Sequence, residues 1–144
     1  MSLREPIVAL VDDDKIFQFT ASRTIRTLNL TDKILQFENG EEALKYLADN
    51  ASSRESLPDC ILLDINMPVV DGWMFLEDYS GLKPNLSKEI SIYMVSSSID
   101  PGDIRRAESM PDVVEYVVKP VSREKFIELV KRVALTHFTL LSGC

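Results

Sequence analysis

Five short apolar runs, each followed by a polar or amphipathic stretch, constrain the fold of this 144-residue chain more than any other feature of its sequence. The runs are mostly continuous rather than alternating and are rich in Ile and Val, which is typical of strands covered on both faces in a parallel sheet. They are residues Ile7–Val11, Ile34–Phe37, Cys60–Leu63, Ile90–Val95 and Val113–Val118. This alternation predicts an α/β domain with five strands and five helices.

The stretches between the runs carry helical patterns with good start signals. Asn39 is a suitable N-cap with Glu42 at the capping-box position, and Asp100 is a suitable N-cap followed by Pro101 at the first helical position. The predicted helices are Lys15–Leu28, Glu41–Leu47, Gly72–Tyr79, a short helix from Pro101 that ends before Pro111, and a long final helix after the cap Ser122. Right-handed crossovers would place helices on both faces of the sheet. The segments Asn50–Asp59 and Gly81–Glu89 are predicted to be long surface loops.

Composition and charge exclude several classes of protein. The chain is 45% apolar and 27% charged, a balance typical of one globular domain, which we expect to span residues 1–144. A formal net charge of −7 argues against a nucleic-acid-binding surface. No apolar stretch approaches the roughly 20 residues of a membrane span, and the N-terminus lacks a signal-peptide core, so we expect no membrane insertion and a cytoplasmic location. Cys60 should be buried and Cys144 exposed, as suits a reducing compartment.

Polar residues follow four of the five predicted strands. In an open parallel sheet, ligands bind beyond the carboxyl ends of the strands, where the strand order reverses. The residues found there are Asp12-Asp13-Asp14 after the first strand, Asp64 and Asn66 after the third, Ser96-Ser97-Ser98 after the fourth, and Lys119-Pro120 after the fifth. The sequence therefore predicts one polar site at this edge of the sheet.

The carboxylates of that site indicate a divalent cation. Asp12, Asp13 and Asp64 at neighbouring strand ends would repel one another unless a positive charge offset them. Mg²⁺ takes oxygen ligands and keeps waters and phosphate oxygens in its shell, and Mn²⁺ could substitute for it. Three carboxylates, the Lys119 ammonium and Mg²⁺ sum to about zero charge. Such a site would let Asp64 attack a phosphoryl group as a carboxylate nucleophile.

These residues also match a known family. Over about residues 5–136 the chain resembles the receiver domain of two-component response regulators, of the single-domain chemotaxis type. The matching motifs are Val11-Asp12-Asp13, Leu62 to Gly72 around Asp64, Met94-Val95-Ser96-Ser97, and Tyr116 to Pro120. The resemblance implies a flavodoxin-like, doubly wound (βα)5 fold with strand order 2-1-3-4-5.

The resemblance further implies a role for each matched position. Asp64 would be the phosphoacceptor. Asp13 would bind the metal directly, with Asp12 helping partly through water and Asn66 contributing its backbone carbonyl. Lys119 would pair with Asp64 and then with the phosphoryl group. Asp14 is interpreted as a helix cap rather than a ligand.

Further positions would form the switch and the phosphate pocket. Ser96 takes the switch hydroxyl position and Tyr116 the switch aromatic position. Ser97, Asn66 and Pro120 would line the phosphate pocket, and the Lys119–Pro120 bond is typically cis in the family. Family members use the Asn66 and Ser98 positions to tune the lifetime of the phosphoryl group.

The function implied is that of a phosphoacceptor signalling protein rather than a metabolic enzyme. A sensor histidine kinase or a histidine phosphotransfer protein would supply the phosphoryl group. The surface of about residues 100–140 would then change its affinity for a protein target, or the phosphoryl group would pass on in a phosphorelay. An Asp-nucleophile phosphatase of the haloacid-dehalogenase type is an alternative, but it needs a second acid where Asn66 stands. A receiver used only as a binding module is the other alternative.

Overall fold

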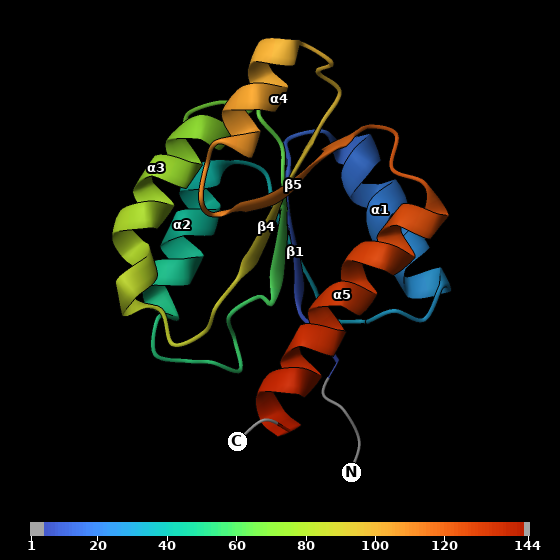
Figure 1. Ribbon diagram of the computed structural model, residues 1–144, viewed down its shortest axis with the longest axis vertical. Helices are drawn as coiled ribbons and strands as arrows, with labels where there is room; N and C mark the ends of the chain where they lie inside the picture. Colours follow the sequence, from blue (N-terminus) through green and yellow to red (C-terminus); the bar gives the residue numbers. More distant parts are fainter. Residues whose placement is uncertain (1–4, 143–144) are drawn as a thin grey trace.

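A five-stranded parallel sheet in the order β2-β1-β3-β4-β5 forms the centre of the molecule (Figure 1). The computed structural model describes the backbone of residues 5–142 and the side chains of residues 5–133. The strands are β1 (Val8–Val11), β2 (Ile34–Phe37), β3 (Cys60–Leu63), β4 (Ser91–Ser96) and β5 (Val113–Val118). The predicted fold class and strand order are confirmed, and the strand bounds differ from the predicted ones by one residue at most.

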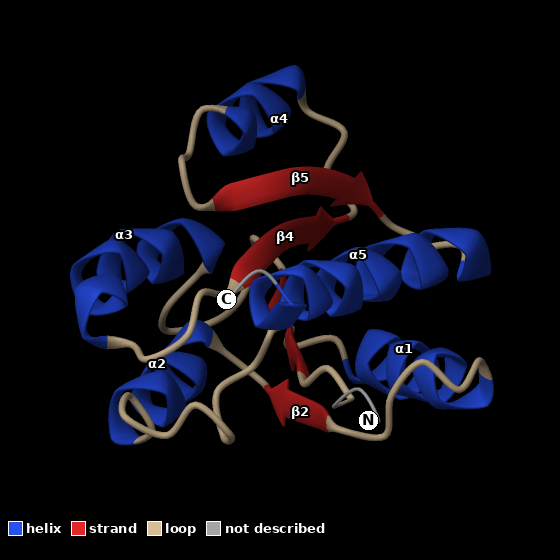
Figure 2. Cartoon of the chain, turned by 60° about the horizontal axis from the view of Figure 1, so that its bottom comes forward, coloured by secondary structure: helices blue, strands red, loops and turns tan. Residues whose placement is uncertain are grey.

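Helices cover both faces of this sheet. They are α1 (Lys15–Thr27), α2 (Gly40–Asp49), α3 (Gly72–Leu82), α4 (Pro101–Glu108) and α5 (Arg123–Ser142), with a short 3₁₀ helix, η1 (Lys83–Asn85). Figures 1 and 2 show α2 and α3 on one side of the sheet and α1 and α5 on the other, with α4 beside β5. Within the described part of the chain, no helix is both long and apolar enough to span a lipid bilayer.

The two faces of the sheet explain why the strands read as continuous apolar runs. Successive strand residues point to opposite faces, and here both faces are buried. Ala9 and Val11 of β1 belong to the core cluster that includes Ala43 of α2 and Phe75 of α3. The alternate residues Val8 and Leu10 belong to the cluster formed with α1 and α5. Cys60 is buried in this second cluster, which confirms its predicted burial, whereas Cys144, predicted to be exposed, lies outside the described residues.

The helix starts follow the predicted caps. The side chain of Asn39 accepts a hydrogen bond from the Glu42 amide at 2.9 Å, and that of Asp100 accepts one from Gly102 at 3.1 Å. Asp14 accepts from the Ile16 and Phe17 amides, which confirms that it caps α1. These caps satisfy backbone donors that have no partner inside the helix.

The predicted loop Gly81–Glu89 is wrong in its first half. Helix α3 continues to Leu82, and η1 follows it at once. Pro84 permits this because a proline fits the first turn of a helix, where no amide donor is needed. The remainder of the segment is tied to the Asn50–Asp59 loop, since the Ser87 amide donates to the Ala51 carbonyl at 2.9 Å.

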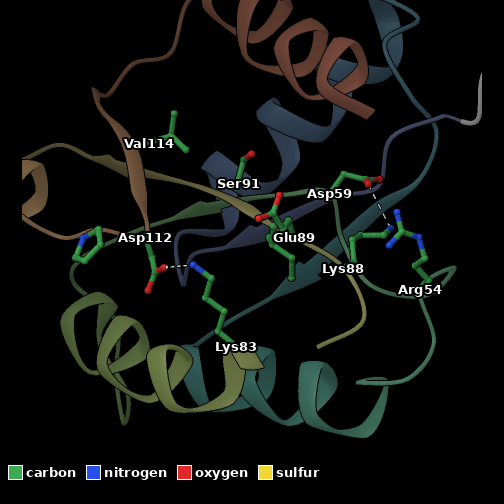
Figure 3. Close-up of a pocket in the computed structure, with 10 residues that line it drawn as sticks. Arg54, Asp59, Lys83, Lys88, Glu89, Ser91, Asp112 and Val114 are labelled. Carbon is green, nitrogen blue, oxygen red and sulfur yellow. Dashed lines mark hydrogen bonds and ion pairs between the residues drawn. The ribbon is translucent and has the colours of Figure 1, made fainter. Parts of the chain in front are cut away.

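A buried ion pair closes the amino edge of the sheet (Figure 3). Lys88 Nζ lies 3.3 Å from Asp59 Oδ1 and donates to the Leu57 carbonyl at 2.7 Å. Asp59 Oδ2 accepts from the Ile7 amide at 2.8 Å, so the pair joins the starts of β1 and β3 to the chain leading into β4. Asp59 and Lys88 line a cavity of about 300 Å³ at this amino edge, whereas Asp12 and Asp64 follow the carboxyl ends of β1 and β3.

Candidate functional site

Three carboxylates meet at the carboxyl edge of the sheet. Asp12 and Asp13 follow β1, and Asp64 follows the neighbouring strand β3. One carboxylate oxygen from each lies within 4.8 Å of the others. Asp12 is 1% exposed and Asp64 8% exposed, whereas Asp13 faces solvent. Adjacent parallel strands thus bring together the acids that the sequence predicted to meet.

Lys119, at the end of β5, completes this cluster. Its Nζ lies 2.8 Å from Asp12 Oδ2 and 3.8 Å from Asp64 Oδ2. The ammonium also lies 4.5 Å from the centre of the Phe17 ring, in a cation–π contact that restricts where the long side chain can go. The Lys119–Pro120 peptide bond is cis, as the family resemblance implies.

Backbone donors and one close backbone approach orient the acids. Asp64 Oδ1 accepts from the Ile65 amide at 2.8 Å, and Asp12 Oδ1 accepts from the Asp14 amide at 2.9 Å. The loop after Asp64 folds back so that the Gly72 amide donates to the Ile65 carbonyl at 2.8 Å. A Cβ at Gly72 would lie 2.5 Å from the Asp64 carbonyl oxygen, so this turn requires glycine.

The electrostatics of the cluster favour a divalent cation. Burial raises the pKa of Asp64 to about 6, and the neighbouring charge of Asp12 adds to the effect. Burial likewise raises the pKa of Asp12, although the hydrogen bond from Lys119 opposes it. Three carboxylates and one ammonium leave a formal charge of −2. The described structure pairs the buried Asp12 Oδ2 only with the Lys119 ammonium, and the remaining negative charge of this oxygen-donor set fits Mg²⁺.

The other predicted site residues lie at the same edge, in contacts of their own. Ser96 is the last residue of β4, lies beside Val118 of β5 and is fully buried. Its backbone carbonyl accepts a hydrogen bond from the Lys119 amide at 2.9 Å. Ser97, Asn66 and Pro120 are exposed in the loops that follow β4, β3 and β5. Their predicted roles toward metal and phosphate stay predictions.

Ser98 links the predicted switch residues to α4. Its amide donates to Ser96 Oγ at 3.1 Å, and its carbonyl accepts from the Tyr116 hydroxyl at 2.8 Å. Its own hydroxyl donates to Asp103 Oδ2 in the first turn of α4 at 2.7 Å. Tyr116 packs against the α2–α3 core cluster. The two predicted switch residues therefore hold the same loop, through different groups of Ser98.

Two residues contact the site although the sequence pattern did not predict it. Phe17, expected only as part of an apolar helix face, lies under Lys119. Gln18 donates to backbone carbonyls at the strand ends beneath Asp12. Their only sequence signal is a position in the first turns of the helix that follows the Asp12-Asp13-Asp14 motif.

The raised pKa of Asp64 predicts a pH-dependent stability in the absence of metal. The pKa of this carboxyl is about 6 in the folded protein, against an ordinary value of 3.8. Its contribution to the free energy of unfolding is therefore fully present below pH 3.8 and is lost as the pH rises through about 6. Asp64→Asn should therefore be more stable than wild type by about 1 to 3 kcal/mol at pH 8. Urea unfolding in EDTA at pH 4 and pH 8 measures this, and a difference that is equal at both pH values would contradict it.

Fold and site together define a doubly wound α/β domain with a carboxylate cluster where such domains bind ligands. The family model for the response regulator receiver domain matches residues 8–131. The chain belongs to this family, which confirms the resemblance found in the sequence. The "Probable methanogenesis regulatory protein FilR2" of Methanothrix harundinacea is 30% identical over 127 residues, covering 88% of this chain and 80% of that protein.

Solved structures agree with this assignment. A two-component response regulator from Cytophaga hutchinsonii has a TM-score of 0.80 and 29% identity, over 90% of this chain and 98% of that one. The Mn²⁺-bound form of the response regulator Rcp1 has a TM-score of 0.68 at 22% identity, over 89% of this chain and 91% of that one, and so shows a common fold. Other relatives are longer: the chain matches 15% of the sensor histidine kinase CheAY of Helicobacter pylori, at 32% identity.

Proposed function

We propose that the protein accepts a phosphoryl group on Asp64 from a phosphohistidine of a sensor kinase or a histidine phosphotransfer protein, in the cytoplasm. The observation that carries the proposal is the convergence of Asp12, Asp13 and Asp64 with the Lys119 ammonium at one sheet edge. This arrangement combines a carboxylate nucleophile, a cation site and a fixed positive charge, which are the parts that phosphoryl transfer needs.

The carboxylates of Asp13, Asp12 and Asp64 and the backbone carbonyl of Asn66 would hold Mg²⁺, with Mn²⁺ as a substitute. The response regulator Rcp1, which shares this fold, was solved in a Mn²⁺-bound form, which supports a divalent cation in the proposal. When bound, the metal neutralises charge on the phosphoryl oxygens and on the carboxylates. Asp13 is the exposed member of the cluster and lies where a hydrated ion can enter.

The transfer itself is an in-line displacement. An Asp64 carboxylate oxygen forms the new bond to phosphorus while the phosphorus–nitrogen bond of the phosphohistidine breaks. The electron pair of that bond stays on the nitrogen of the leaving imidazole, which departs neutral because a proton is present on its other ring nitrogen or is taken up from water. Lys119 lies 3.8 Å from Asp64 Oδ2 and would pair with the transferred group. Later attack by water on the acyl phosphate returns Asp64 and inorganic phosphate.

Exposed apolar side chains beside the cluster support docking of the phosphodonor there. Ile16 is 75% exposed and Phe19 62% exposed, both in the first turns of α1 directly after Asp13 and Asp14. Phe19 lines a surface groove together with Asp12 and Asp13. A partner that covers these apolar groups brings its histidine next to the carboxylates and excludes water from them.

The output would be a population shift on the surface formed by α4, β5 and α5. Ser96 Oγ would turn toward the phosphoryl group and lose its hydrogen bond from the Ser98 amide. Because Ser98 is hydrogen-bonded to Tyr116 and to Asp103 of α4, this change would reach both of them. The phosphoryl group biases the two states by the difference in its interactions with them. The changed surface would then bind a separate protein target, or Asp64 would pass its phosphoryl group on in a phosphorelay.

The test is chemical labelling with a small acyl phosphate and Mg²⁺, read by mass spectrometry of the intact protein. We expect wild type to gain one phosphoryl group that is lost on standing, and Asp64→Asn to gain none. Asp14→Asn is the matched control, because Asn still caps α1 and the substitution removes an acid beside the cluster. Asp14→Asn should label like wild type.

The same assay separates the alternatives. An unlabelled wild type would contradict the phosphoacceptor role and would leave a binding module. An Asp64→Asn variant that labels as well as wild type would place the acceptor elsewhere. Sustained release of phosphate from a phosphomonoester would instead point to a phosphatase, a reaction for which position 66 offers an amide and not an acid.

A further inference from the structure

Gln18, in the second turn of α1, forms side-chain hydrogen bonds to the ends of two strands beneath the carboxylate cluster. Its side-chain Nε2 donates to three backbone carbonyls, those of Leu10, Asp12 and Phe37, each at 3.0 Å. Leu10 lies in β1, Asp12 directly follows the last residue of β1, and Phe37 is the last residue of β2. One amide therefore fixes two adjacent strand ends at the position where Asp12 and Asp13 leave the sheet.

The Asp12 carbonyl is the group that makes this contact relevant to the cation site. It belongs to the peptide unit that joins Asp12 to Asp13, so its orientation sets the directions in which both side chains leave the backbone. The same strand ends are joined once more, because the Asp12 amide donates to the Phe37 carbonyl at 3.0 Å. Movement of this peptide would separate the two carboxylates from Asp64.

The surroundings of Gln18 Oε1 indicate that the hydrogen bonds donated by Nε2 determine how this side chain is oriented. Gln18 Oε1 is buried and accepts no hydrogen bond from the described residues. Proteins rarely leave a buried acceptor without a partner, and such exceptions call for an explanation. The explanation here is that the NH₂ group of Gln18 donates to three carbonyls. Turning the amide over would place Oε1 against these three carbonyl oxygens, so the orientation that leaves Oε1 without a donor is the favoured one.

We propose that Gln18 is a positioning residue of the cation site, which holds the Asp12–Asp13 peptide so that both carboxylates converge with Asp64. The inference rests on the proposed function, since it takes Asp12 and Asp13 as metal-binding groups. Gln18 itself acts through the backbone and not on the ion. Groups that orient metal ligands in this indirect way change metal affinity by about 10- to 100-fold.

Gln36 provides a matched comparison within the same structure. It is also a glutamine, lines the same groove as Gln18, Asp12 and Asp13, and donates through its Nε2. Its acceptor is the Gln18 backbone carbonyl in α1 at 3.3 Å, and its side chain is exposed. It therefore makes a contact of the same kind without touching the strand ends that carry the acids.

The experiment measures Mg²⁺ binding by calorimetry in the full chain for Gln18→Met and Gln36→Met. Methionine has nearly the volume of glutamine but no donor, so we expect the Mg²⁺ dissociation constant to rise about tenfold or more in Gln18→Met. Gln36→Met should stay within about twofold of wild type. In the labelling assay, Gln18→Met should need more Mg²⁺ for half-maximal rate, while its rate at saturating Mg²⁺ changes little. A dissociation constant within twofold of wild type for Gln18→Met would overturn the proposal.

A measurement on the wild-type protein covers the case in which Gln18→Met does not fold. The side-chain NH₂ signals of Gln18 should shift during an NMR titration with Mg²⁺, and those of Gln36 should not. Unchanged Gln18 signals at saturating Mg²⁺ would also overturn the proposal. If wild type binds Mg²⁺ through Gln18-dependent positioning but takes up no phosphoryl group, the proposed function fails and the positioning role stands.

Discussion

Replacing Lys119 by methionine is expected to slow phosphoryl transfer to Asp64 by about 100-fold or more at saturating Mg²⁺. The Lys119 ammonium lies within 3.8 Å of both Asp12 and Asp64 and is held against the Phe17 ring. It is therefore in place before the reaction to neutralise the oxygens of the phosphoryl group. Removing one such preorganised group from a site that stabilises developing charge costs about 10² to 10³ in rate. Methionine keeps an apolar stem of similar length against Phe17, so the change isolates the charge.

Mg²⁺ binding separates this effect from loss of the cation site. Without the ammonium the three carboxylates carry a larger uncompensated negative charge, so Lys119→Met should bind Mg²⁺ at least as tightly as wild type. Lys125→Met is the matched control, since Lys125 of α5 pairs with Glu115 of β5 and Glu128 of α5, neither of which belongs to the carboxylate cluster. Labelling rates measured with a small acyl phosphate should be normal in this control. A Lys119→Met rate within threefold of wild type would show that the ammonium does not assist the transfer.

The position of this lysine could be read from the sequence, because topology alone determines it. Parallel strands in the order 2-1-3-4-5 bring their carboxyl ends to one edge, so Asp12, Asp64 and Lys119 must come near one another whatever the helices do. The caps Asn39, Asp100 and Ser122 were predictable for a similar reason. A cap depends on a few neighbouring residues, and the structure has the expected side-chain contacts at each.

Features that depend on how elements pack were beyond the sequence pattern. Phe17 and Gln18 were expected on a helix, but which of its residues lie under the site depends on how α1 rests on the sheet. The continuation of α3 to Leu82 was missed because local patterning favoured a loop there, whereas packing against the core decides the end. Lys88 lies in the segment that was predicted to be a surface loop, and nothing near it in the sequence predicts its burial beside Asp59.

That buried pair leads to the largest expected change in stability. Asp59→Ala should lower the free energy of unfolding by about 3 to 5 kcal/mol, because it removes the carboxylate that faces a buried ammonium. The side chains of Lys88 and Asp59 are 3% and 8% exposed. The substitution also removes the acceptor of the Ile7 amide at 2.8 Å, which leaves a buried donor at the start of the sheet. Urea unfolding at constant pH measures the loss.

The exposed pair on the other side of the same cavity is the control (Figure 3). Lys83 and Asp112 lie 2.8 Å apart, with side chains 52% and 14% exposed, so Asp112→Ala should cost less than about 1 kcal/mol. The double variant Asp59→Ala with Lys88→Met removes both buried charges and should recover part of the stability lost in Asp59→Ala alone. A double variant as unstable as the sum of two independent losses would show that the ion pair is not the cause.

Function should be unaffected by breaking this pair as long as the protein stays folded. Asp59 and Lys88 lie at the amino edge of the sheet, whereas Asp12, Asp64 and Lys119 lie at the carboxyl edge. Changes at separate sites without shared partners act independently. At a temperature well below its melting point, Asp59→Ala should therefore take up a phosphoryl group at the wild-type rate. A slow rate in folded Asp59→Ala would mean that the amino edge of the sheet is coupled to the phosphoacceptor site through the strands between them.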